Sequence, residues 1–142
     1  MSSLPPPSHA QTESAGSLTK PWVNAVVISQ LLITGSLLTL TFSARTIGKP
    51  TWWLGSLHDP SFFLLWFLPL VAPVAMLVTV LRFSRLLPYT GLGSTLFLAA
   101  IAISDLSRTP GIALAEIALT VCMALTTIAA LAGRRRSIST GL

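Results

Sequence analysis

Four long blocks of apolar residues, separated by short polar links, constrain this chain more than any other feature. The blocks run at about 22–43, 61–82, 86–104 and 111–133. At a rise of 1.5 Å per residue, an α-helix of about 20 residues crosses the ~30 Å hydrocarbon core of a bilayer. The pattern therefore predicts an all-α integral membrane protein, with four transmembrane helices in an up-down antiparallel bundle.

The charge content supports a membrane environment. Only 9% of the residues are charged and 52% are hydrophobic, whereas a soluble domain carries about 25% charged residues. The net charge of +5 comes from basic residues that flank the apolar blocks, so we expect contacts with membrane lipids and no binding of nucleic acid.

The chain divides into three parts: a tail before the apolar blocks, the blocks themselves, and a tail after them. Residues 1–20 are rich in Ser and Pro and predict a disordered cytoplasmic tail. Residues 21–133 form the transmembrane domain, and residues 134–142 form a basic cytoplasmic tail. The first block is longer than the apolar region of a cleaved secretory signal, about 7–15 residues, which favours a membrane span. The third block is the weakest, and the alternative is that it dips into the membrane and returns.

Prolines mark the expected starts of the second and fourth helices and an expected bend in the second. The pairs Asp59-Pro60 and Thr109-Pro110 are typical of a capping residue followed by proline in the first turn. Pro69 and Pro73 each remove a backbone donor within the second block, so this helix is expected to be kinked.

The distribution of basic residues predicts the orientation. With four spans, one side of the membrane holds six cations and the other holds three, which are Arg45, Lys49 and Arg108. The positive-inside rule places the richer side, and with it both termini, in the cytoplasm, and we expect a multi-pass protein of the plasma membrane. The residues expected at the lipid headgroups are Arg82, Arg85, Arg134, Arg135, Arg136, Trp52 and Trp53.

Glu116 is the acidic residue inside the fourth block, about five residues from its start. A carboxylate in hydrocarbon costs about 2.5 kcal/mol or more and usually faces a partner or water. Three interpretations stay open: a structural group that reaches water or a hydroxyl, a contact with a partner subunit, or a proton or cation relay. The polar residues expected to share its face or to approach it from the first span are Thr120, Thr127, Gln30, Thr34 and Thr41.

Small residues four apart form a second face of the fourth block, at Ala118, Cys122, Thr126 and Ala130. Gly91, Thr95 and Ala99 form a matching row on the third block. Such rows let helix backbones approach closely. They predict a tight hairpin of the third and fourth spans through these small faces, with Glu116 pointing elsewhere.

No residue pattern indicates catalysis or a cofactor. The two histidines, His9 and His58, lie outside the blocks, which argues against haem held by paired histidines in the membrane. His58 and Asp59 are too few ligands for a metal site, and a lone cysteine cannot form an internal disulfide. We therefore expect a non-enzymatic protein without a cofactor.

In length and number of spans the chain is similar to the small multidrug-resistance transporters. That family carries its essential carboxylate in the first span, whereas this chain carries Glu116 in the fourth, so the activity is not transferred. The leading expectation is an accessory or stabilising subunit of a larger membrane complex, such as a transporter or a respiratory assembly, which binds other membrane-protein subunits. The alternative is a small homo-oligomeric transporter that uses Glu116 as its coupling carboxylate.

Overall fold

A computed structural model describes residues 18–49, 51–54 and 60–134, and within them the chain is helical without a β-strand. The prediction of four apolar helices is confirmed, because four helices in this part of the chain are long and apolar enough to cross a membrane. The α-helices are α1 (Lys20–Thr46), α2 (Val71–Arg82), α3 (Leu87–Asp105) and α4 (Pro110–Ala132), and the 3₁₀ segments are η1 (Trp52–Leu54), η2 (Pro60–Leu70) and η3 (Ser84–Leu86).

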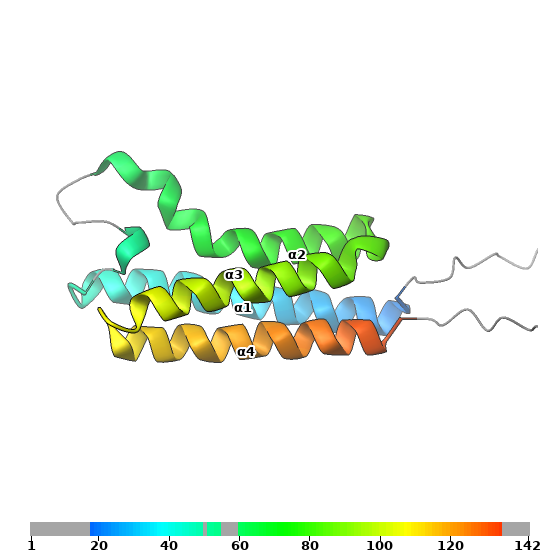
Figure 1. Ribbon diagram of the computed structural model, residues 1–142. Coiled ribbons are helices and arrows are strands. Elements are labelled where there is room, and N and C mark those ends of the chain that lie inside the picture. Colours follow the sequence, from blue (N-terminus) through cyan, green and yellow to red (C-terminus); the bar gives the residue numbers. More distant parts are fainter. Residues whose placement is uncertain (1–17, 50, 55–59, 135–142) are drawn as a thin grey trace, which may run out of the picture.

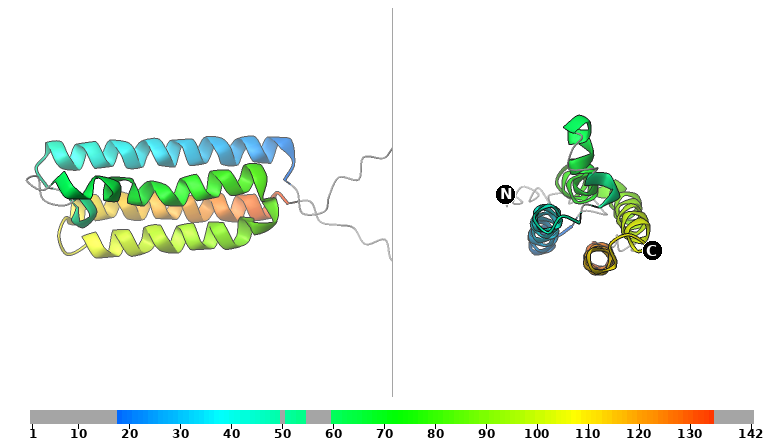
Figure 2. Two further views of the ribbon diagram at one scale, coloured as in Figure 1. Left: turned by 90° about the horizontal axis from the view of Figure 1, so that it is seen from above. Right: turned by 90° about the vertical axis from the view of Figure 1, so that its left-hand side faces the viewer.

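The four α-helices lie side by side in one bundle (Figure 1). Viewed from the end, each helix has two neighbours, in the order α1, α2, α3, α4 around the bundle (Figure 2). The contact between α3 and α4 is the most extensive of the four. Leu18 and Arg134 form a backbone bridge, so the described chain begins and ends at the same end of the bundle.

Proline and glycine account for several helix boundaries. α1, α3 and α4 each carry a proline in the first turn, where no intrahelical donor is needed. Thr109 occupies the N-cap of α4 as predicted, but its side chain makes no capping hydrogen bond. Gly133 follows the last residue of α4. The expected cap Asp59 lies outside the described residues.

The second candidate span consists of two kinds of helix. It covers Leu64–Arg82 and changes from the 3₁₀ segment η2 to the α-helix α2 at Val71. Pro69 lies inside η2 and has no N–H to donate to an α-helical hydrogen bond. Figure 1 shows that η2 does not continue the line of α2.

Two apolar clusters hold the bundle together. The larger one lies between the helices and includes Val26, Met76, Leu98 and Met123. The smaller one joins Ala44, Trp53, Leu54 and Ile101, at the end of the bundle opposite Leu18 and Arg134. Large apolar side chains also cover the outside of every helix, which suits a protein whose solvent is hydrocarbon.

Candidate functional site

Two carboxyl groups are buried together at the end of the bundle opposite the chain ends. Asp105 is the last residue of α3 and is 0% exposed, and Glu116 lies in the second turn of α4 and is 4% exposed. The short link between the helices brings the two carboxyl groups close enough to interact with each other. A predicted span that ends at residue 104 leaves Asp105 outside, which is why sequence reasoning missed it. The only sequence signal for Asp105 is that an acidic residue stands one position beyond the end of the third block.

The 3₁₀ segment η1 contacts this carboxyl pair. The backbone N–H of Trp52 donates to Asp105 Oδ1 at 3.3 Å, and the indole of Trp53 interacts with both carboxyl groups. Trp53 is 1% exposed, so the expected contact of Trp53 with lipid headgroups is wrong. Its ring packs among Ala44, Leu54 and Ile101 instead. Trp52 remains exposed.

One oxygen of each carboxyl group lacks a hydrogen-bond partner in the described part of the chain. Asp105 Oδ2, Glu116 Oε2 and Trp53 Nε1 are all buried without a partner in the described part of the chain. The hydroxyls of Thr51, which precedes Trp52, and of Thr109, which lies between Asp105 and Glu116 in the sequence, are buried and unpartnered as well. An unsatisfied buried polar group costs about 1–3 kcal/mol, and more when charged, so this cluster is a functional candidate rather than a packing device.

Three described cations, Arg45, Lys49 and Arg108, lie toward this end of the bundle. Arg108, in the link between α3 and α4, interacts with Asp105 over a distance. The Arg45 guanidinium lies over the Trp66 ring, 3.5 Å from its centroid. Lys49 and Arg108 line an open cavity of about 630 Å³, and Thr109 forms part of the same wall.

The polar residues expected to approach Glu116 bond elsewhere. The hydroxyls of Thr120 and Thr127 donate to the carbonyls of Glu116 and Met123, one turn back in α4. Those of Thr34 and Thr41 donate in the same way within α1, and Gln30 Nε2 contacts Met123 Sδ at 3.5 Å. None of these printed hydrogen bonds is to the Glu116 carboxyl group, so their proximity to it stays a prediction.

The tight hairpin of α3 and α4 uses a different face of α4 from the one predicted. A Cβ atom built on Gly91 would overlap the side chain of Thr127, which shares the face of Glu116. Ala118 and Cys122, expected at this interface, are exposed. The other members of the two small rows are partly or fully buried: Thr95, Ala99, Thr126 and Ala130.

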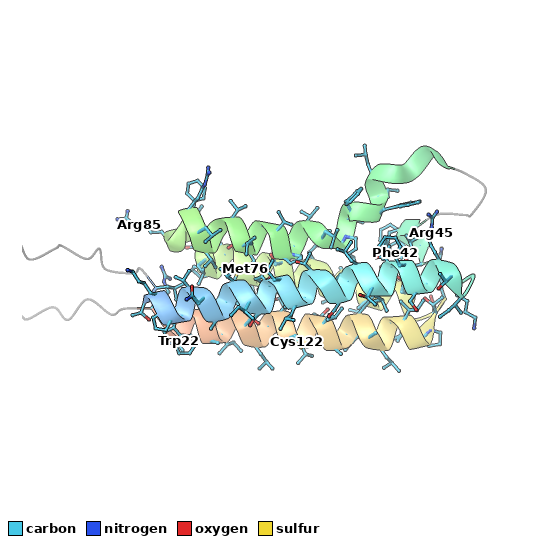
Figure 3. The ribbon with its side chains drawn as sticks, turned by 180° about the vertical axis from the view of Figure 1, so that it is seen from behind. Trp22, Phe42, Arg45, Met76, Arg85 and Cys122 are labelled. Carbon is cyan, nitrogen blue, oxygen red and sulfur yellow. The ribbon has the colours of Figure 1, made fainter. Side chains whose placement is uncertain are left out.

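The exposed small residues of α4 border a groove against α1. Three hollows, of about 670, 330 and 250 Å³, share lining residues and join along these helices. Figure 3 looks onto α1 with α4 below it and labels Cys122, which lines two of the hollows. We call this feature the α1–α4 groove. The residues that line it in α1 are Trp22, Ala25, Val26, Ser29, Leu31, Leu32, Ile33, Gly35, Ser36, Thr39, Leu40 and Ser43, and those in α4 are Ala115, Ala118, Leu119, Cys122, Leu125, Thr126 and Ala129.

The residues expected at the lipid headgroups otherwise lie at the surface. Arg82 and Arg85 are exposed, and Figure 3 shows Arg85 toward the same end of the bundle as Trp22 and away from Arg45. Arg134 follows the end of α4, whereas Arg135 and Arg136 lie outside the described residues.

The fold and its two features define a class: a small helical protein with four candidate membrane spans, a buried carboxyl pair at one end and an open lateral groove. No protein family, characterised protein or solved structure was found to match the chain. The function has therefore to be argued from these two features.

Proposed function

We propose that this protein is a non-catalytic accessory subunit that seats a transmembrane helix of a larger membrane complex in the α1–α4 groove. The single observation that carries the proposal is the groove itself. From Ala25 to Ser43 it follows 18 residues of α1, which is about 27 Å at helical rise and close to the thickness of the hydrocarbon core.

The spacing of the groove residues suits a helix as the occupant. One row within the α1 wall, Ala25, Ser29, Leu32, Ser36, Thr39 and Ser43, has alternating intervals of four and three residues, and Ala115, Ala118, Cys122, Leu125 and Ala129 form a similar row in α4. A 3.5-residue period keeps one row facing a partner helix in a left-handed supercoil. Eleven of the nineteen lining residues are Ala, Gly, Ser, Thr or Cys, and small residues allow the backbones of membrane helices to approach closely.

We further propose that the helices cross the plasma membrane in an up-down antiparallel order, with the second span kinked at its prolines. The bridge between Leu18 and Arg134 supports an even number of crossings. Lys20, Arg82, Arg85 and the arginines that follow α4 would then lie on the cytoplasmic side.

A second candidate function is a small homo-oligomeric transporter that couples through Glu116. The specific observation in its favour is Asp105, because a relay needs more than one ionisable group, and two buried carboxyl groups interact here. In this case the helix in the α1–α4 groove would belong to another copy of the chain.

Site-specific photocrosslinking in native membranes tests the proposal. A photoreactive amino acid is introduced at Ser36, which lines the groove, and as a matched control at Ala100, an exposed small residue of α3. The accessory-subunit proposal expects one discrete protein product from position 36, heavier than a pair of these 15.1 kDa chains, and lipid adducts from position 100.

The size of the product separates the two candidates. A product with the mass of two chains at position 36 would contradict the accessory role and favour the homo-oligomeric transporter. Lipid adducts alone at position 36 would contradict both, because the groove would then be filled by hydrocarbon chains.

A further inference from the structure

We infer that Asp105, Glu116 and Trp53 form an internal site that binds one exchangeable proton. The site stands whether or not the chain transports a substrate or holds a partner helix. It assigns a ligand, the proton, to the two buried carboxyl groups, and it makes the Trp53 Nε1–H a donor to the charge that remains.

The two carboxyl groups cannot both be ionised cheaply in this position. Asp105 and Glu116 are 0% and 4% exposed and interact directly. Two negative charges that share a buried site repel each other strongly, and a single proton shared between them removes that repulsion. The proton forms an O–H bond with one carboxylate, and the O–H can donate to the other carboxylate.

Trp53 is the second and independent observation. Its Nε1–H is buried, lacks a hydrogen-bond partner and belongs to an indole that interacts with both carboxyl groups. A donor in this position stabilises the one negative charge that remains after a single proton has bound. It also disfavours a metal cation as the ligand, because an N–H donor repels it, and no three metal-ligating side chains gather among the described residues.

The charged groups that could neutralise the carboxyl pair belong to the neighbouring elements. α1 contributes Arg45, which lies over the Trp66 ring, and Lys49, which lines the open cavity. The link to α4 contributes Arg108, which interacts with Asp105. The segment η2 carries no titratable side chain. Of these three cations, Arg108 is the one whose charge acts on the pair, so the repulsion between the two carboxylates is left for the proton to remove.

The open cavity gives the proton a route. Thr109 forms part of the cavity wall, its backbone N–H donates to the Asp105 carbonyl at 2.9 Å, and its hydroxyl is buried and unpartnered. We propose that a proton from hydronium in the cavity enters past Thr109, which lies on the cavity wall one helical turn beyond Asp105. On release it returns by the same path to water, so protons balance without a co-reactant.

Infrared spectroscopy of the full chain in lipid nanodiscs tests this site. The C=O band of protonated carboxyl groups is followed during a pH titration of the wild type, Asp105→Asn and Glu116→Gln. We expect one protonated buried carboxyl per chain at neutral pH in the wild type. We expect its titration midpoint to fall to lower pH in either variant, because the remaining carboxyl group stays buried but no longer has a charged neighbour. Helical circular dichroism of each variant verifies that it is folded.

A purely structural role of Trp53 would leave the midpoint of the proton titration unchanged, so Trp53→Phe tests its role as a donor. The ring volume is nearly kept and the Nε1–H donor is removed, so we expect about tenfold tighter proton binding, measured as a shift of the same titration to higher pH. The inference is overturned by a wild type without a protonated carboxyl at neutral pH. It is equally overturned by a band that survives unchanged in both single-carboxyl variants, or by a midpoint that moves with sodium concentration.

Discussion

The two sides of α4 use small residues in opposite ways. On the side of α3, Gly91 lies so close to Thr127 that a methyl group does not fit between the helices. On the side of α1, a Cβ atom on Gly35 would meet nothing within 4 Å, and Ala118 and Cys122 are exposed beside it. The first interface is closed by the chain itself, whereas the second is left open. Small residues in a membrane helix therefore mark a close approach, but they do not say whether the partner is in the same chain.

The largest expected effect is a difference in stability between alanine substitutions at neighbouring positions on the two sides of α4. Met123 is 0% exposed and Leu125 is 60% exposed. Met123→Ala is expected to destabilise the purified chain by about 2–5 kcal/mol because it opens a cavity in the core, whereas Leu125→Ala is expected to cost less than about 0.5 kcal/mol. Unfolding in mixed detergent micelles measures both. Equal losses for the two variants would remove the distinction between a closed and an open side.

A smaller effect is expected from glycine substitutions in the two interfaces. Gly91→Ala forces α3 away from Thr127 and should cost about 1–3 kcal/mol through overpacking. Gly35→Ala should be neutral or stabilise α1 by up to about 1 kcal/mol, because alanine favours a helix and nothing obstructs it. The same unfolding measurement applies. A loss of stability in Gly35→Ala equal to that in Gly91→Ala would contradict the open groove.

The four spans could be predicted from the sequence because hydrocarbon demands about 20 apolar residues per crossing, and that demand is visible in the blocks. The faces of α4 could not be assigned in the same way. Lipid is as apolar as the interior of the bundle, so apolar side chains do not indicate which face is buried. Ala118 and Thr127 were both plausible contacts for α3, and only the positions of the backbones distinguish them.

Only one residue of the candidate site, Glu116, could be predicted from the sequence. Glu116 is conspicuous because it interrupts an apolar block, whereas Asp105 follows the end of its block and looks like an ordinary loop residue. Trp53 reads as an interfacial tryptophan, because aromatic rings in a polar link usually lie at the headgroups. The link folds inward here, and such long-range placement leaves no local pattern.

The most direct test of the open groove is Gly35→Leu, compared with Ala100→Leu on the exposed face of α3. We expect both variants to unfold like the wild type when purified, because neither substituted side chain enters the core. In native membranes, Gly35→Leu should abolish the discrete protein crosslink formed from position 36, and Ala100→Leu should leave it intact. A crosslink of undiminished yield in Gly35→Leu would contradict a helix seated between α1 and α4.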